Sequence, residues 1–323
     1  MLELRNIEKY YNPGTINEMC LFDKFNLTVD KGEFVSVVGS NGSGKTSMLN
    51  ILCGSIPVDG GQILMNREDI TTKKEFKRNQ KIGRVYQNPA MGTCPTMTIL
   101  ENMSLADNKG KKFGLGFGTN KKRVDYYREL LSQLGLGLED MMGSKVGSLS
   151  GGQRQAMALL MTTMAPIEIL ILDEHTAALD PKTAELIMEL TGKVVKEKNL
   201  TTIMVTHNLR YAVEYGNRIL MMHQGHAVLD KAGEEKAKLV VDDLLDQFNQ
   251  ISIEWLDSFF MDVMSCWCVI RRISQFHIRS ITNFKESLYD SFSKCCLSNQ
   301  RSGFIIFDRT RKDLCCTRTV TIN

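Results

Sequence analysis

The chain has 323 residues, a formal net charge of +3 and 43% hydrophobic residues. This length allows one large or two modest domains with a buried core, and the small net charge gives no indication of a nucleic-acid partner. The longest apolar run, 259–270, is shorter than a membrane span and is interrupted by Asp262, and the charged N-terminus lacks the apolar stretch of a signal peptide. We therefore expect a cytoplasmic protein with no nucleic-acid partner.

Strand and helix signals alternate along the first 255 residues, which favours an α/β layer fold. The predicted elements, in chain order, are a buried strand over 33–39, a helix from 45 that Gly54 ends, a strand over 168–173, a helix over 181–198, a strand over 201–207 and a hairpin over 218–230 that turns at Gln224 and Gly225. Between 88 and 147 the pattern changes to helices with loops, so this block is a candidate subdomain.

The last part of the chain differs in composition from the rest. Six of the nine cysteines lie in 256–323, as adjacent pairs and one Cys-x-Cys, which is not the loop spacing of a zinc site. This segment also has no clear helix or strand period. We interpret 1–255 as the folded domain and 256–323 as an appendage that is poorly ordered, or as an artefactual, out-of-frame extension of the gene.

The segment GSNGSGKT over 39–46 matches the pattern G-x-x-x-x-G-K-S/T and stands between a predicted strand and a predicted helix. Its glycines allow backbone N–H groups to surround a polyphosphate, whereas an ordinary glycine-rich turn is the alternative. Lys45 would reach the terminal phosphates, and the Thr46 hydroxyl would ligate Mg²⁺. The predicted nucleotide-binding residues of this loop are Gly39, Ser40, Asn41, Gly42, Ser43, Gly44, Lys45, Thr46 and Ser47.

Two adjacent acids end the predicted strand ILILDE. A carboxylate at this place is suited to hold Mg²⁺ through water, so we assign this role to Asp173. Glu174 is then the candidate general base that polarises the water attacking the γ-phosphate. His207, at the end of the next strand, is a candidate contact of the same phosphate, with a structural histidine as the alternative.

A second anion-binding pattern occurs in GSLSGGQRQAMALL over 147–160. It predicts a polar loop over 148–153 that runs directly into a helix. Ser150 and the N–H groups of Gly151 and Gly152 would lie at the positive end of that helix, a place suited to an anion. The chain therefore carries two phosphate-binding patterns about 100 residues apart.

Five ordered motifs resemble those of ABC-type ATPases, namely Gln87 in RVYQNP, LSGGQRQ over 149–155, ILILDE, AALD over 177–180 and VTH over 205–207. The resemblance covers about residues 1–250. It implies an α/β P-loop NTPase with a RecA-like core, an antiparallel β subdomain and an inserted helical subdomain over about 89–158. It also implies that the ligands are ATP and Mg²⁺ and that the chain hydrolyses ATP.

The resemblance further implies roles for single residues. Gln87 would lie at the hinge of the helical subdomain and sense the γ-phosphate and Mg²⁺, so that the metal is held by Thr46, Gln87 and Asp173. Asp180 would lie in the loop that communicates across a dimer, and His207 would be the switch histidine. Tyr11 is the candidate for stacking on adenine, with Tyr10 as the alternative; a tyrosine packed on the sheet is the simpler interpretation of either.

Members of this family form head-to-tail dimers in which the LSGGQ loop of one chain covers the ATP bound to the other. Ser150, Gly151, Gly152 and Gln153 would then complete a nucleotide site together with Lys45 of a second copy. One departure from the family pattern is His175, where most relatives have proline. Both acids before it are kept, so we expect activity to be retained and His175 to be exposed and without effect.

A single nucleotide-binding domain resembles the separate ATPase subunit of a bacterial transporter. The implied function is ATP hydrolysis at the inner face of the cell membrane, powering import of a small solute through a transmembrane permease, with a solute-binding protein as an indirect partner. The segments YYNPGTINEMCLF and DEHTAALDPKT resemble a group of uncharacterised importer ATPases, sometimes assigned to aromatic amino acids. The alternative is a non-transport ABC ATPase of a cytosolic assembly system of the iron–sulfur type.

Overall fold

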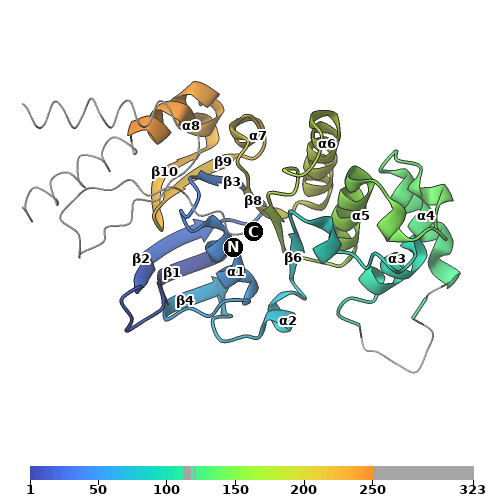
Figure 1. Ribbon diagram of the computed structural model, residues 1–323, viewed down its shortest axis with the longest axis horizontal. Coiled ribbons are helices and arrows are strands. Elements are labelled where there is room, and N and C mark those ends of the chain that lie inside the picture. Colours follow the sequence, from blue (N-terminus) through green and yellow to red (C-terminus); the bar gives the residue numbers. More distant parts are fainter. Residues whose placement is uncertain (112–117, 120, 251–323) are drawn as a thin grey trace, which may run out of the picture. The chain divides into compact units, whose positions relative to one another are not determined.

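A six-stranded sheet forms the centre of the computed structural model, which describes residues 1–111, 118–119 and 121–250 (Figure 1). Its strand order is β10-β9-β3-β8-β7-β6, and all neighbours are parallel except the antiparallel pair β9 and β10 at one edge. The strands are β3 (Phe34–Gly39), β6 (Ile82–Val85), β7 (Ile169–Asp173), β8 (Thr201–Val205), β9 (Arg218–His223) and β10 (His226–Ala232).

The central strands are buried on both faces because helices or the second sheet cover them. Every residue of β3, β7 and β8 is buried, and their sequences FVSVVG, ILILD and TTIMV are nearly continuous apolar or β-branched runs. The strands predicted over 33–39 and 168–173 are thereby confirmed. The strand predicted over 201–207 is shorter than expected, since β8 ends at Val205 and His207 lies beyond it.

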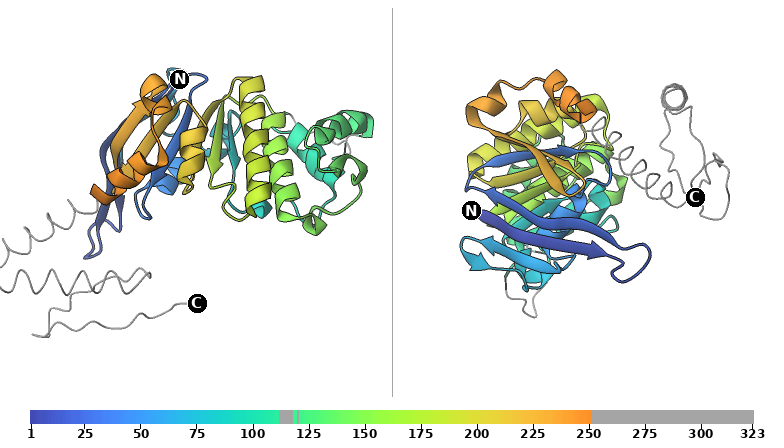
Figure 2. Two further views of the ribbon diagram at one scale, coloured as in Figure 1. Left: turned by 90° about the horizontal axis from the view of Figure 1, so that it is seen from above. Right: turned by 90° about the vertical axis from the view of Figure 1, so that its left-hand side faces the viewer.

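A four-stranded antiparallel sheet, in the order β2-β1-β4-β5, faces the larger sheet across a shared core (Figure 2). Its strands are β1 (Leu2–Tyr11), β2 (Met19–Val29), β4 (Gly60–Met65) and β5 (Glu68–Asp69). Helix α1 (Lys45–Cys53) belongs to the same core, with Met48, Leu49 and Leu52 fully buried. This packing holds the first turn of α1 at the carboxyl end of β3.

The helical region is inserted between β6 and β7, which are neighbours in the sheet. Its longer elements are α3 (Ile99–Asp107), α4 (Val124–Ser132) and α5 (Gly151–Met164), with 3₁₀ turns η1 (Pro89–Met91), η2 (Lys121–Arg123), η3 (Leu138–Asp140) and η4 (Val146–Ser148). Apolar residues of α3, α4 and α5, including Met103, Tyr127 and Met157, share one core. α3 and α4 lie beyond α5, on the side away from the four-stranded sheet (Figures 1 and 2).

Helices α6 (Pro181–Lys198), α7 (Leu209–Glu214) and α8 (Gly233–Ala237) flank the larger sheet. The short helix α2 (Glu75–Arg78) packs on α1, where Arg78 donates to the carbonyls of Ile51 and Leu52. The helix predicted over 181–198 is confirmed as α6, and Gly54 ends α1 as expected, with its N–H donating to the carbonyls of Asn50 and Ile51. The predicted hairpin turn is also confirmed, since Gln224 and Gly225 both have left-handed φ angles of 44° and 78°.

Among the described residues, no helix is long and apolar enough to cross a membrane. The segment 256–323, which we interpreted as an appendage, lies outside the described residues.

Candidate functional site

The loop between β3 and α1 opens at the carboxyl edge of the parallel strands, where ligands bind in folds of this kind. Three of its glycines, Gly39, Gly42 and Gly44, have φ angles of 155°, 78° and 100°. A Cβ at Gly39 would lie 2.2 Å from the Met222 carbonyl oxygen, so no larger residue fits there. The loop formed by GSNGSGKT therefore requires glycine at these positions and ends at the first N–H groups of α1, where the sequence predicted a polyphosphate to bind.

Lys45 is buried and bonded to the loop that it belongs to. Its Nζ donates to the carbonyl oxygens of Gly39 and Ser40, both at 2.8 Å, and to Ser43 Oγ at 3.3 Å. Burial lowers the pKa of Lys45, although the charge of Glu174 acts in the opposite direction. The ammonium thus holds the phosphate loop in a closed arrangement, while the next residue, Thr46, is exposed in the first turn of α1.

Asp173 and Glu174 leave the end of β7 in different directions. Asp173 Oδ2 accepts a hydrogen bond from an Arg84 guanidinium nitrogen at 2.6 Å. Glu174 has a left-handed φ of 47°, and its N–H donates to the Val205 carbonyl of β8 at 2.9 Å. The left-handed φ of Glu174 changes the direction of the chain between the two carboxylates, and they have different partners. The separate roles predicted for Asp173 and Glu174 need such a separation.

His207 lies against Glu174, with its Nε2 2.7 Å from Glu174 Oε1. The side chains are 46% and 16% exposed, so the pair faces solvent at the carboxyl edge of the sheet. Neighbouring parallel strands bring them together, since Asp173 of β7 is paired with Val205 of β8. The two residues that the sequence predicted at the γ-phosphate are thus in contact with each other.

Gln87 follows β6 by two residues and is exposed. The residue before it is fixed by the helical region, because Gln155 of α5 donates from Nε2 to the Tyr86 carbonyl at 3.1 Å. A movement of α5 would therefore pull directly on the backbone next to Gln87.

Tyr11 and Tyr10 differ in what they contact. The Tyr11 hydroxyl donates to Ser47 Oγ in the first turn of α1 at 3.2 Å, and its ring packs on the core around that helix. Tyr10 lies by Cys20 instead, and a hydrogen bond with that thiol is the main cause of the raised pKa of Tyr10. Of the two, Tyr11 lies beside the phosphate loop, which is the arrangement the sequence interpretation preferred.

The segment LSGGQ begins a helix earlier than predicted. We expected a loop as far as Gln153, but α5 starts at Gly151 because Ser150 caps it: Ser150 Oγ accepts from the Gln153 N–H at 3.2 Å and Gln153 Oε1 accepts from the Ser150 N–H at 3.0 Å. Gly152 has a packing role, since a Cβ there would lie 2.1 Å from Thr183 Cγ2 of α6. Gln153 also donates to the Leu136 carbonyl at 3.3 Å.

Asp180 also acts as a helix cap. Its carboxylate accepts from the Thr183 N–H at the start of α6 at 3.1 Å. Hydrogen bonds from Thr183, first from its side chain and then from its N–H, lower the pKa of Asp180. The dimer-facing loop predicted around Asp180 is therefore joined to α6 and, through Thr183, to the start of α5.

The expectation that His175 is exposed is wrong. Its side chain is 2% exposed, and its Nε2 lies 3.2 Å from Thr191 Oγ1 of α6. Because the Thr191 hydroxyl donates to the Ile187 carbonyl at 2.7 Å, its oxygen is left to accept from His175 Nε2–H. Burial lowers the pKa of His175 to about 4. The left-handed φ of Glu174 turns the chain so that His175 lies beneath α6. No local sequence pattern predicts this burial.

Sequence reasoning missed Arg84 altogether. It is a charged residue in the short strand IGRV, and it bonds to Asn50 of α1 as well as to Asp173. A charged residue inside an otherwise apolar strand usually has a partner of opposite charge. The arginine in IGRV was therefore the sequence signal that could have predicted a buried ion pair.

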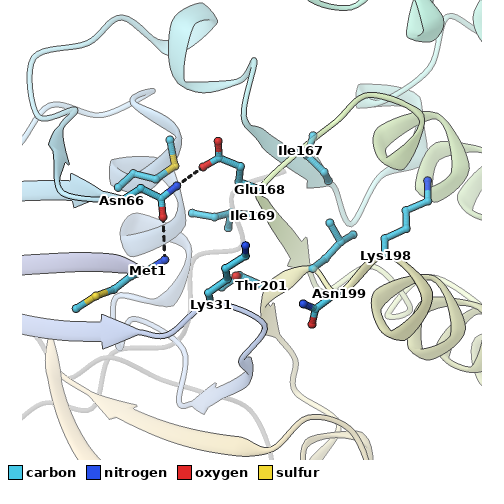
Figure 3. Close-up of a pocket in the computed structure, with 11 residues that line it drawn as sticks. Met1, Lys31, Asn66, Ile167, Glu168, Ile169, Lys198, Asn199 and Thr201 are labelled. Atoms are coloured by element: carbon cyan, nitrogen blue, oxygen red, sulfur yellow. Dashed lines mark hydrogen bonds between the residues drawn. The ribbon is translucent and has the colours of Figure 1, made fainter.

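A cavity of about 420 Å³ lies at the opposite, amino edge of the sheet and is lined by residues such as Ile169 and Thr201, which begin β7 and β8 (Figure 3). Some of its polar groups bond to one another, since the Met1 amine donates to Asn66 Oδ1 and Asn66 donates to Glu168. It is thus separate from the phosphate loop, which opens at the carboxyl edge.

Comparison with known proteins agrees with this geometry. The family model described as ABC transporter matches residues 22–177. The tyrosine transport ATP-binding protein of Clostridioides difficile is 46% identical over 253 residues, which are 77% of this chain and 98% of that protein. The phosphonates import ATP-binding protein PhnC of Lactococcus lactis subsp. cremoris is 30% identical over 76% of this chain and 98% of its own length.

Two further matches extend the comparison. The spermidine/putrescine import ATP-binding protein PotA of Haemophilus influenzae is 33% identical over 73% of this chain, which spans only 59% of that protein. Among solved structures, a dimeric ATP-binding cassette in a post-hydrolysis state with ADP and Pi has a TM-score of 0.62 and 31% identity, covering 72% of this chain and 98% of that one. The predicted P-loop fold class is thereby confirmed. The 46% identity over 77% of this chain and 98% of the tyrosine transport protein shows that the chain belongs to the ABC transporter family, as an ATP-binding and ATP-hydrolysing subunit.

Proposed function

We propose that this ATPase subunit powers the import of a small solute through a separate membrane permease, at the inner face of the membrane and with a solute-binding protein as an indirect partner. Support comes from the relatives, which are named for transport of tyrosine and import of phosphonates or of spermidine and putrescine. These names favour transport over the iron–sulfur assembly alternative. Tyrosine, or another aromatic amino acid, is the solute to test first, because the relative named for it has the highest identity of the three.

In this proposal the phosphate loop exchanges its internal bonds for bonds to ATP. Lys45 releases the carbonyls of Gly39 and Ser40 and donates to phosphate oxygens instead. The N–H groups at the start of α1 receive the remaining phosphate charge, and Tyr11, anchored on Ser47, lies beneath the adenine.

The donors around the loop fit Mg²⁺. The Thr46 hydroxyl is exposed at the start of α1, and Asp173 and Gln87 add a carboxylate and an amide, all of which are hard oxygen ligands. When bound there, the metal would offset the charge of the phosphates.

The observation that carries the hydrolytic role is the contact between Glu174 and His207. A carboxylate held at 2.7 Å by an imidazole has a fixed orientation, and the left-handed turn at Glu174 separates it from Asp173. In this proposal Glu174 accepts a hydrogen bond from the attacking water, while His207 holds Glu174 and reaches the γ-phosphate once ATP is bound.

We further propose that two copies share their sites head to tail. Within one chain, Ser150 and Gln153 bond to each other and Gln153 also bonds to Leu136, while Ser150 at the cap of α5 is exposed and can face a second copy. The solved relative with ADP and Pi is described as dimeric, which supports a dimer here. Ser150, Gly151, Gly152 and Gln153 would then cover the nucleotide bound by Lys45 of the other copy.

The test of the hydrolytic role is Glu174→Gln. We expect ATP binding to be kept while hydrolysis slows by about two to four orders of magnitude, with an ATP-bound dimer accumulating in size-exclusion chromatography. Glu185→Gln is a matched control, because that acid occupies an exposed position of α6 and pairs with Arg210. Near-normal turnover of Glu174→Gln would assign the general base to another residue.

The transport role is tested by deleting the gene in its host and restoring it as wild type or as Glu174→Gln. Uptake of labelled tyrosine should return with the wild type alone. Uptake that is unchanged by the deletion would refute tyrosine as the solute, and the same assay with other small solutes would then test import itself.

A further inference from the structure

Arg84 links three elements beside the phosphate loop. It lies on β6, and its two terminal nitrogens donate to Asp173 Oδ2 on β7 at 2.6 Å and to Asn50 Oδ1 on α1 at 2.8 Å. The side chains of Arg84 and Asp173 are only 9% and 13% exposed. The acid that we assign to the metal is therefore already in a nearly buried ion pair.

Besides Asn50, the side chains of Tyr86 and Cys53 lie close to Arg84. The Tyr86 ring lies 4.7 Å from the guanidinium carbon and covers one side of it. The nearby Cys53 thiol stays neutral, because burial raises its pKa to about 11. Within the described part of the chain, Arg84 Nε has no hydrogen-bond partner, so the guanidinium holds Asp173 through one terminal nitrogen and one carboxylate oxygen.

A nearly buried carboxylate requires a compensating positive charge, and arginine keeps its charge at every pH at which proteins fold. The incoming nucleotide is itself strongly anionic. Without a cation at Asp173, the carboxylate would repel the γ-phosphate across a site of low effective dielectric constant. Arg84 is fixed by Asn50 in the position where it offsets that repulsion.

We propose that Arg84 is a positioning residue that holds and neutralises Asp173 while Mg²⁺ is absent, and so sets how strongly ATP binding depends on the metal. The proposal rests on the function proposed above, in which Asp173 holds Mg²⁺. Arg84 engages Oδ2, which leaves Oδ1 to meet the water shell of the metal. With Arg84 in place, ATP binds appreciably before its metal is in position; without Arg84, the metal becomes indispensable for binding.

The test measures the Kd of trinitrophenyl-ATP by fluorescence on the full chain, once with saturating Mg²⁺ and once with EDTA. For Arg84→Met we expect the Kd in EDTA to rise about tenfold or more, while the Kd in Mg²⁺ rises less than about threefold. Arg84→Lys, which keeps the charge, should bind in EDTA within about threefold of the wild type.

Arg78→Met is the matched control. Arg78 is also buried, at 3% exposure, and donates to the Ile51 and Leu52 carbonyls of the same helix α1. It makes no ion pair with Asp173, so its loss should change both Kd values by the same factor. Circular dichroism and thermal melting show which variants fold.

The double variant Arg84→Met with Asp173→Asn removes both charges and should restore binding in EDTA to near the wild-type value. It also remains informative if Arg84→Met alone fails to fold, since replacing both members of a buried pair is tolerated better than replacing one. Equal weakening of both Kd values in Arg84→Met, or no restoration in the double variant, would overturn the proposal. Failure of the proposed function has another signature, namely a wild type whose Kd does not respond to Mg²⁺.

Discussion

Replacing His175 by glutamine should make the stability of the domain less sensitive to acid. The histidine is 2% exposed and bonded through Nε2 to Thr191, and burial lowers its pKa to about 4. Glutamine also offers an N–H group for Thr191 but cannot take up a proton in this pH range. The substitution therefore removes the titration while keeping a donor for the hydrogen bond.

The sign of the effect follows from which state binds the proton. In the unfolded chain His175 has a pKa near 6.5, so between about pH 6.5 and 4 the unfolded chain takes up a proton that the folded chain excludes. Stability is complete above that window and falls as the pH decreases through it. The full loss is about 3 kcal/mol, of which about 2 kcal/mol occurs between pH 7 and pH 5.

Urea unfolding at pH 7 and pH 5 measures this difference. Between the two pH values, the free energy of unfolding of the wild type should fall by about 2 kcal/mol more than that of His175→Gln. At pH 7 the variant should be about 1 kcal/mol less stable than the wild type, because glutamine packs differently at the buried position. His226→Gln, at an exposed position in β10, should keep the wild-type loss. Equal losses for the wild type and His175→Gln would show that His175 is accessible to protons in the folded chain.

Two further experiments test other parts of the protein. Gly225→Ala should destabilise the domain by about 3 kcal/mol or more in urea unfolding, because its φ is 78° and a Cβ would lie 1.7 Å from the Leu21 carbonyl oxygen. Gly14→Ala is its control, with a φ of 73° and open space, and an equal loss in both would refute the steric reasoning. Mixing the inactive variants Lys45→Ala and Ser150→Arg should restore up to about a quarter of the shared sites, seen as ATP-dependent dimerisation. A mixture as inert as its components would contradict the head-to-tail dimer.

Local patterns predicted the central parts of the fold. The phosphate loop, the strands β3 and β7, the end of α1 at Gly54 and the hairpin turn at Gln224 are each specified by a few consecutive residues, such as a glycine where a left-handed φ is required. The contact between Glu174 and His207 was also within reach, because both residues follow parallel strands and such strands end at one edge of the sheet.

The remaining features depend on packing between distant segments. His175 is buried because α6 crosses over the turn that follows β7, and Arg84 finds its partners on α1 and β7, at residues 34 and 89 positions away. The start of α5 was misplaced for a different reason. Glycines favour a loop by propensity alone, but the reciprocal bonds of Ser150 and Gln153 stabilise the first turn of the helix.

The internal bonds of Lys45 have a consequence for how selective the phosphate loop is. A ligand must replace two carbonyl oxygens and a hydroxyl that already satisfy the ammonium, so a weak or neutral acceptor gains nothing by entering. A polyanion gains, because charged acceptors form stronger hydrogen bonds than carbonyls do. The same lysine keeps the phosphate loop ordered independently of a ligand. The conformational entropy of the loop is therefore lost during folding, and ligand binding does not have to offset it. Lys45 thus both fixes the shape of the phosphate loop and favours anionic ligands over neutral ones.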